Sequence, residues 1–140
     1  MISVYHDGQD GLEATAGFPP GSWVHVETPD EAEIERLHTE LGVPRGFLAA
    51  ALDPREVART DSQRDFHLII VRAPYDFGQR ERVPFRTVPL AMISGATHFV
   101  TICQHSIDFV HDLNYDYDEA ELHTRRANRM ILAILGVVGH

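Results

Sequence analysis

The stretch LDPREVARTDSQRDFHLIIVRAP, from Leu52 to Pro74, decides the fold of this chain. It begins with a charged turn that contains Asp53, Glu56 and Arg59, and a short polar spacer follows. The apolar run Phe66–Val71 comes next. A run this short, rich in branched residues, predicts a strand that is buried on both faces. We therefore expect a central strand of a sheet, ended by the proline that closes the stretch.

Two helices are predicted immediately before this stretch. Thr28 is expected to cap the first helix, with Glu31 completing a capping box after the intervening proline. Gly42 is expected to end that helix. A second short helix is predicted from Arg45 to about Leu52.

Strands are predicted near the N-terminus. Ile2–Tyr5 and Leu12–Thr15 are typical of a hairpin. Ser22–Val26 alternates and is rich in residues that favour strands, so we expect Trp23 to be half covered.

A second hairpin is predicted after the central strand. Phe85–Ser94 and Thr97–Gln104 are expected to pair in antiparallel fashion across a turn at Gly95. Pro89 lies inside the first of these strands and predicts an edge position or a bulge.

The last predicted element is a helix from about Asp118 towards Val138, with acidic residues leading and arginines later, as the helix dipole prefers. Its apolar pattern is still running at His140, so we expect the natural protein to continue towards further segments. Residues 1–140 are predicted to form a single domain without repeats.

Composition excludes several classes of protein. The formal net charge of −9 argues against a nucleic-acid or anionic-membrane surface and suits cations or basic partners. The single cysteine, Cys103, excludes an internal disulfide, and its apolar neighbours predict a buried, inert thiol. The N-terminus has no secretory signal. The longest apolar helical segment, Met130–Val138, is about half of the ~20 residues that a membrane span needs.

A search for metal ligands finds one candidate group, Asp108, His111 and Asp112. On a helix these side chains share one face and could hold a divalent ion through oxygen and imidazole ligands, although a solvated helix face fits the same pattern. An acidic cluster could attract Mg²⁺ or Ca²⁺ loosely, but it lacks the glycine spacing of an EF-hand. Its members are Asp112, Asp116, Asp118, Glu119 and Glu121.

Other chemistry finds less support. His25 and His67 lie in predicted strands, where a histidine is more often bonded within the sheet than a ligand. The chain has no GxSxG elbow and no phosphate-binding glycine loop, so an enzyme is the weaker hypothesis from residues alone.

Several segments agree in order and spacing with one family: the chain resembles the N-terminal cytoplasmic domain of CorA-type magnesium transporters. The resemblance covers roughly residues 1–104, and the last helix is similar to the family's segment that leads towards its stalk helix. The matching segments are Gly21–Val26, Thr28–Glu31, Leu41–Pro44, Leu52–Asp53, Glu56 with Arg59, Phe66–Val71 with Pro74, Thr87–Leu90 and Phe99–Thr101.

The resemblance implies an α/β/α domain with a mixed parallel and antiparallel sheet. It implies a pentamer in the full-length transporter, with this domain as a funnel on the cytoplasmic face of the cell membrane. Divalent cations bound between neighbouring funnels are expected to hold the closed state. Mg²⁺ is the expected cation, with Co²⁺, Ni²⁺ and Zn²⁺ as further candidates, and no metal is expected to be required for folding. The charged turn Asp53, Glu56 and Arg59 is expected to be structural, so that Arg59→Ala lowers stability.

The chain also departs from the family. The pore signature Gly-Met-Asn, the stalk and the two membrane helices are absent from this sequence. Ala49 and Ala50 stand where the resemblance places acidic ligands of an inter-subunit metal. Three alternatives therefore stay open: a branch of the family that senses another ion, a branch that couples zinc transport to protons, and a branch that holds no ion at this position. Two alternatives to a transporter domain remain: a stand-alone soluble binding module of the same fold, and a small metal-dependent enzyme using Asp108, His111 and Asp112.

Overall fold

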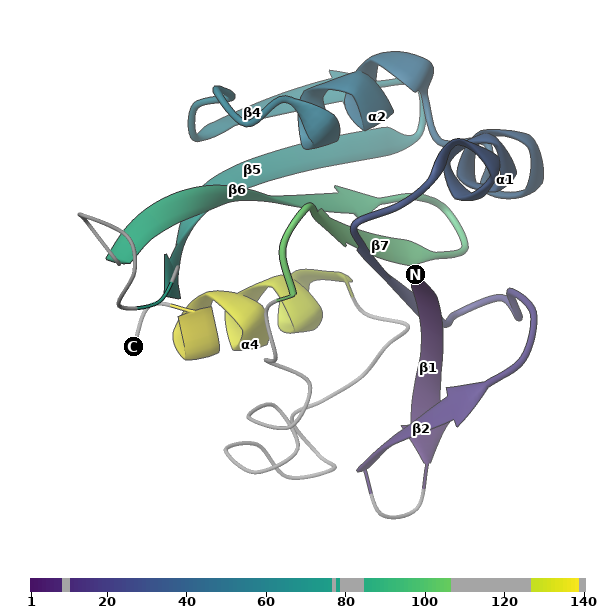
Figure 1. The fold of residues 1–140 in the computed structure, drawn as a ribbon. Coiled ribbons are helices and arrows are strands. Elements are labelled where there is room, and N and C mark those ends of the chain that lie inside the picture. The colour runs from purple at the N-terminus through teal and green to yellow at the C-terminus, as the bar shows by residue number, and fades with distance from the viewer. Residues whose placement is uncertain (9–10, 77, 79–84, 107–126, 139–140) are drawn as a thin grey trace.

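The computed structural model describes residues 1–8, 11–76, 78, 85–106 and 127–138. They form one sheet of seven strands with helices on both of its sides (Figure 1). The described residues contain no helix long and apolar enough to span a membrane. The elements are β1 (Ile2–Gly8), β2 (Gly11–Thr15), β3 (Trp23–Glu27), α1 (Glu31–Leu41), α2 (Arg45–Leu52), β4 (Arg59–Gln63), β5 (Phe66–Asp76), β6 (Phe85–Ser94), β7 (Phe99–Cys103) and α4 (Ala127–Val138).

The sheet is mixed, as the family resemblance implies. Its strand order is β2-β1-β3-β7-β6-β5-β4. Every neighbouring pair is antiparallel except β3 and β7, which run parallel with Trp23 opposite Phe99 and Glu27 opposite Cys103. This parallel pair joins the three N-terminal strands to the hairpins that follow α2.

The sheet has a core on each face. On one face, Leu37 of α1 and Phe47 of α2 pack in a cluster that includes Leu68 of β5. On the other face, Met130 and Ile134 of α4 pack in a cluster that includes Leu90, Met92 and Trp23. Figure 1 shows α4 across the sheet from α1 and α2. The expected α/β/α arrangement is therefore confirmed.

Two prolines lie within strands that are internal to the sheet. β5 does not end at Pro74 as predicted but continues to Asp76, and β6 contains Pro89 although β5 and β7 flank it. The shorter neighbouring strands explain both positions. Pairing of β4 with β5 stops at Ile70, and pairing of β7 with β6 stops at Leu90, so within the described part of the chain each proline has a strand on one side only. A residue without an N–H is tolerated at such a locally open edge.

Two local predictions were wrong. Trp23 is fully buried rather than half covered, because β3 is an internal strand and its neighbour residues on both faces are buried. The N-cap of α1 is Asp30 rather than Thr28: the Asp30 carboxylate accepts from the Glu33 backbone N–H at 2.8 Å, and the Glu33 side chain accepts from the Asp30 N–H at 3.1 Å.

Candidate functional site

The predicted metal ligands Asp108, His111 and Asp112 lie outside the residues that the structure describes, and so does the acidic cluster from Asp112 to Glu121. Among the described residues, no group of three or more His, Cys, Asp and Glu side chains is arranged to hold a metal ion. The metal-site prediction thus stays a prediction.

The charged turn joins α2 to β4, and the structure brings only part of it together. Arg59 Nε donates to Glu56 Oε1 at 2.7 Å, and Arg59 Nη1 lies 3.4 Å from Asp61 Oδ2. Asp53 does not join this pair. Its carboxylate accepts from the backbone N–H of Arg55 at 2.9 Å and lies 3.5 Å from Arg55 Nε. The turn is thus closed by two separate local sets of charges.

A further arginine, which the sequence did not single out, fastens this turn to the sheet. Arg72 of β5 donates from Nη1 to the carbonyl oxygens of Pro54 and Glu56, at 3.0 and 3.1 Å. It donates from Nη2 to the Thr87 carbonyl at 2.6 Å and from Nε to the Thr87 hydroxyl at 3.2 Å. The signal in the sequence is a lone arginine in an apolar strand, but its partners lie 15 to 18 positions away.

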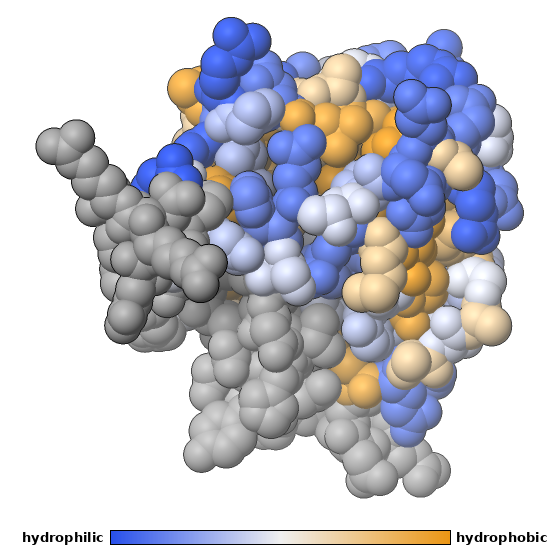
Figure 2. Space-filling view, viewed as in Figure 1, coloured by the Kyte–Doolittle hydropathy of each residue, from blue (hydrophilic) through white to orange (hydrophobic). Residues whose placement is uncertain are grey.

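Ala49 and Ala50 face in different directions. Ala49 is exposed on α2, whereas Ala50 is only 7% exposed and belongs to the core cluster under the helix. In the view of Figure 2 the described surface is mostly hydrophilic, with apolar residues reaching it in the area of α2. Of these two positions, Ala49 is the one from which a longer side chain could reach an ion outside the domain.

A buried polar network crosses the parallel pair at the centre of the sheet. Trp23 Nε1 donates to Thr101 Oγ1 at 2.9 Å, and His25 Nδ1 lies 2.7 Å from the same oxygen. His25 Nε2 lies 2.9 Å from Glu27 Oε1. Ser106 Oγ donates to Glu27 Oε2 at 2.9 Å. The prediction that His25 is bonded within the sheet is confirmed.

This network fits a neutral His25. The Thr101 hydroxyl accepts from Trp23 and can give its own proton to His25 Nδ1, which leaves the His25 Nε2–H to donate to Glu27. Burial lowers the pKa of His25 below 6.5, and this effect outweighs the hydrogen bond and charge of Glu27, which act in the opposite direction. The imidazole therefore acts as an uncharged link between Thr101 and Glu27.

The other predicted side chains have structural surroundings. His67 is exposed on β5, with Nδ1 at 2.9 Å from Ser62 Oγ of β4. Cys103 is fully buried, as predicted, and burial raises the pKa of its thiol. Among the described residues, neither His67 nor Cys103 belongs to a group of three or more His, Cys, Asp and Glu side chains that could hold a metal ion.

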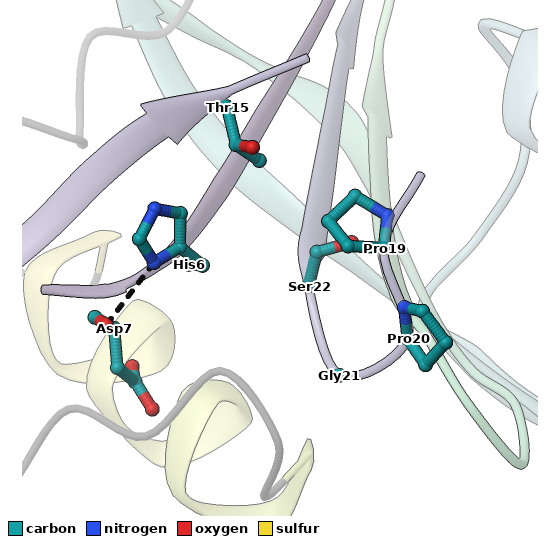
Figure 3. Close-up of a pocket in the computed structure, with 7 residues that line it drawn as sticks. All are labelled: His6, Asp7, Thr15, Pro19, Pro20, Gly21 and Ser22. Atoms are coloured by element: carbon teal, nitrogen blue, oxygen red, sulfur yellow. Dashed lines mark hydrogen bonds between the residues drawn. The ribbon is translucent and has the colours of Figure 1, made fainter. Parts of the chain in front are cut away.

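A hollow of about 530 Å³ opens beside the β1–β2 hairpin (Figure 3). Its walls include His6, Asp7 and Thr15 of the hairpin and Ser22 at the start of β3. The His6 Nδ1–H donates to the Asp7 carbonyl at 3.1 Å. The Ser22 hydroxyl is buried and has no hydrogen-bond partner among the described residues. One carboxylate and one imidazole are too few to hold a metal ion, so this hollow is not a substitute for the metal site that the sequence predicts.

Comparison with known proteins gives a family. The family model described as CorA-like Mg²⁺ transporter protein matches residues 21–139. The cobalt/magnesium transport protein CorA of Methanocaldococcus jannaschii is 33% identical over 52 residues, which are 37% of this chain and 16% of that protein.

Solved structures show the same fold. The soluble domain of CorA from Methanocaldococcus jannaschii superposes with a TM-score of 0.75 at 22% identity, over 99% of this chain and 55% of that one. The complete CorA magnesium transporter of the same organism gives a TM-score of 0.74 at 19% identity, over 99% of this chain and 44% of that one. The chain therefore spans less than half of the length of the complete transporter that it matches.

Proposed function

Because this chain belongs to the family of CorA-like Mg²⁺ transporter proteins, we propose that it is the cytoplasmic regulatory domain of a divalent-cation transporter. The observation that carries the proposal is the family match over residues 21–139. The fold supports it, since it is that of a part of CorA that has been solved separately as a soluble domain. Members of this family are transporters rather than enzymes, which argues against the alternative of a metal-dependent enzyme.

The proposed role is ion-dependent control of a pore in a pentamer. A cation that binds between neighbouring domains stabilises the conformer in which those domains are close together, and its loss releases that conformer. Mg²⁺ is the proposed cation, and Co²⁺, Ni²⁺ and Zn²⁺ are the alternatives. The exposed Ala49 supplies no ligand, so the ion would have to be held by other residues.

A chimeric transporter tests the proposal. Residues 1–140 would replace the structurally equivalent part of CorA from Methanocaldococcus jannaschii, and ion flux would be measured in liposomes. We expect flux to fall as Mg²⁺ is raised on the side of the soluble domain. The unmodified transporter and one lacking this part serve as controls. A chimera that conducts but ignores Mg²⁺, while the unmodified transporter responds, would contradict the regulatory role and favour a stand-alone binding module.

A further inference from the structure

A second hollow of about 530 Å³ lies where β6 extends beyond the end of β7. Arg72, Arg86 and Thr87 line it from β5 and β6, and Gln104 and His105 line it from the chain that leaves β7. Its volume is within the range of small-molecule sites, about 300–1,000 Å³. Pro54 of the charged turn also lines it, but among the described residues none of the side chains in that turn's ion pairs or in the buried network at His25 does.

The lining of this hollow is unusual for an acidic chain. The sequence has 21 acidic and 12 basic residues, yet the described side chains lining the hollow include two guanidinium groups and an imidazole and no carboxylate. A concave wall of one sign concentrates the electrostatic potential and attracts ions of the opposite sign. The ligand that fits this wall is an anion.

Among the residues that the structure describes, Arg72 is held in place by uncharged partners alone. Its four hydrogen bonds go to the carbonyl oxygens of Pro54, Glu56 and Thr87 and to the Thr87 hydroxyl, all of them uncharged acceptors. Among the described residues, no carboxylate forms an ion pair with Arg72. These bonds use four of its five N–H donors and fix the guanidinium plane at the wall of the hollow.

We propose that this hollow binds a small phosphate-bearing anion, with Arg72 and Arg86 contacting its phosphate oxygens. Arg72 keeps one N–H donor and its positive charge for a phosphate oxygen, and a fixed guanidinium loses little freedom on binding. A phosphate ester carries a charge of about −1.5 to −2. Two arginines therefore balance a phosphate ligand better than a ligand with a single carboxylate. The hollow is larger than a bare phosphate, so an organic group such as a nucleoside has room beside it. This proposal does not rest on the transport function.

Titration calorimetry of the chain at low salt, with EDTA present, tests the proposal, using ATP, inorganic phosphate and citrate as probes. We expect ATP to bind, and its affinity to fall as salt is raised, because the contact is between charges. Arg86→Gln is expected to raise the Kd for ATP about tenfold or more. Arg64→Gln is the matched control, because Arg64 is exposed in the β4–β5 turn outside the hollow. It makes the same change in net charge and is expected to alter the Kd less than about twofold.

Arg72→Lys separates the guanidinium from its charge, and circular dichroism checks that the variant is folded. A folded Arg72→Lys chain with weakened ATP binding supports the proposed contact. Binding of inorganic phosphate with the same dependence on Arg86 places recognition on the phosphate group itself. The proposal is overturned if the folded chain binds none of the probes at millimolar concentration. It is also overturned if Arg86→Gln and Arg64→Gln behave alike, or if citrate binds as tightly as ATP.

Discussion

His25 makes the stability of this domain depend on pH. Burial lowers its pKa below the ordinary value of 6.5, so the unfolded chain takes up a proton at a higher pH than the folded chain does. Its contribution to stability is present above about pH 6.5 and is lost as the pH falls from there towards the folded pKa. We predict that the free energy of unfolding decreases between about pH 7 and about pH 5.5.

Urea unfolding across this pH range measures the effect. His25→Gln removes the titrating group and is expected to flatten the curve. His6→Gln changes a histidine that is not buried, on β1, and serves as the control. A His25→Gln chain whose stability falls as steeply with pH as the unmodified chain would contradict the assignment.

Thr101 is the residue on which the buried network depends, since its hydroxyl serves both Trp23 and His25. Thr101→Val keeps the shape but removes the hydroxyl to which both Trp23 Nε1 and His25 Nδ1 are hydrogen-bonded. We predict a loss of about 2–4 kcal/mol in the free energy of unfolding. Thr101→Ser keeps the hydroxyl and removes one methyl group, and is expected to cost about 1 kcal/mol. Equal losses in the two variants, measured by urea unfolding, would show that packing rather than hydrogen bonding decides the site.

The N-terminus of α1 offers a test at the level of an element. Asp30 caps the helix and Thr28 does not, so Asp30→Ala is expected to lower the free energy of unfolding by about 1 kcal/mol. Thr28→Ala is the matched control, because it removes a nearby hydroxyl that makes no cap bond. Chemical denaturation of both variants measures the difference. A larger loss for Thr28→Ala would restore the assignment made from the sequence.

The sequence predicted elements well where strong local signals bound them. The bounds of α2 and β6 agree with prediction, and Gly42 ends α1 in a left-handed conformation as expected. The cap of α1 was misassigned because two overlapping segments, Thr28–Glu31 and Asp30–Glu33, both resemble a capping box. Local sequence does not decide which of the two segments caps α1. The path of the chain between β3 and α1 decides it.

Features that depend on the assembled sheet were not predicted. The burial of Trp23 and the extension of β5 past Pro74 both follow from which strands lie next to which. The role of Arg72 depends on Pro54 and Thr87, which only the tertiary fold brings to it. The family resemblance supplied the correct fold class and a mixed sheet, which patterning alone left open. The predicted metal ligands Asp108, His111 and Asp112 remain untested because they lie outside the described residues.

For the whole molecule, the position of Ala49 leads to a prediction about ion-dependent assembly. Ala49→Asp places a carboxylate on the exposed side of α2, and we expect it to strengthen Mg²⁺ binding about tenfold and to increase the mass in solution as Mg²⁺ is added. Ala49→Asn has a side chain of similar size without the charge and is the control. Calorimetry with light scattering measures both. If the two variants bind Mg²⁺ equally, then this face of α2 does not meet an ion between subunits.

The parallel pairing of β3 with β7 also sets an order of events while the chain is being made. Trp23 meets Phe99, a residue 76 positions later, so β3 has no place in the sheet until β7 exists. At about 5–20 residues per second, the ribosome takes roughly 4–15 s to add that many residues. During this interval β1, β2 and β3 can form no more than a three-stranded antiparallel sheet, in which the apolar strand β3 is an open edge. The N-terminal strands are therefore made first but join the sheet last, and in that interval the nascent chain is most exposed to mispairing.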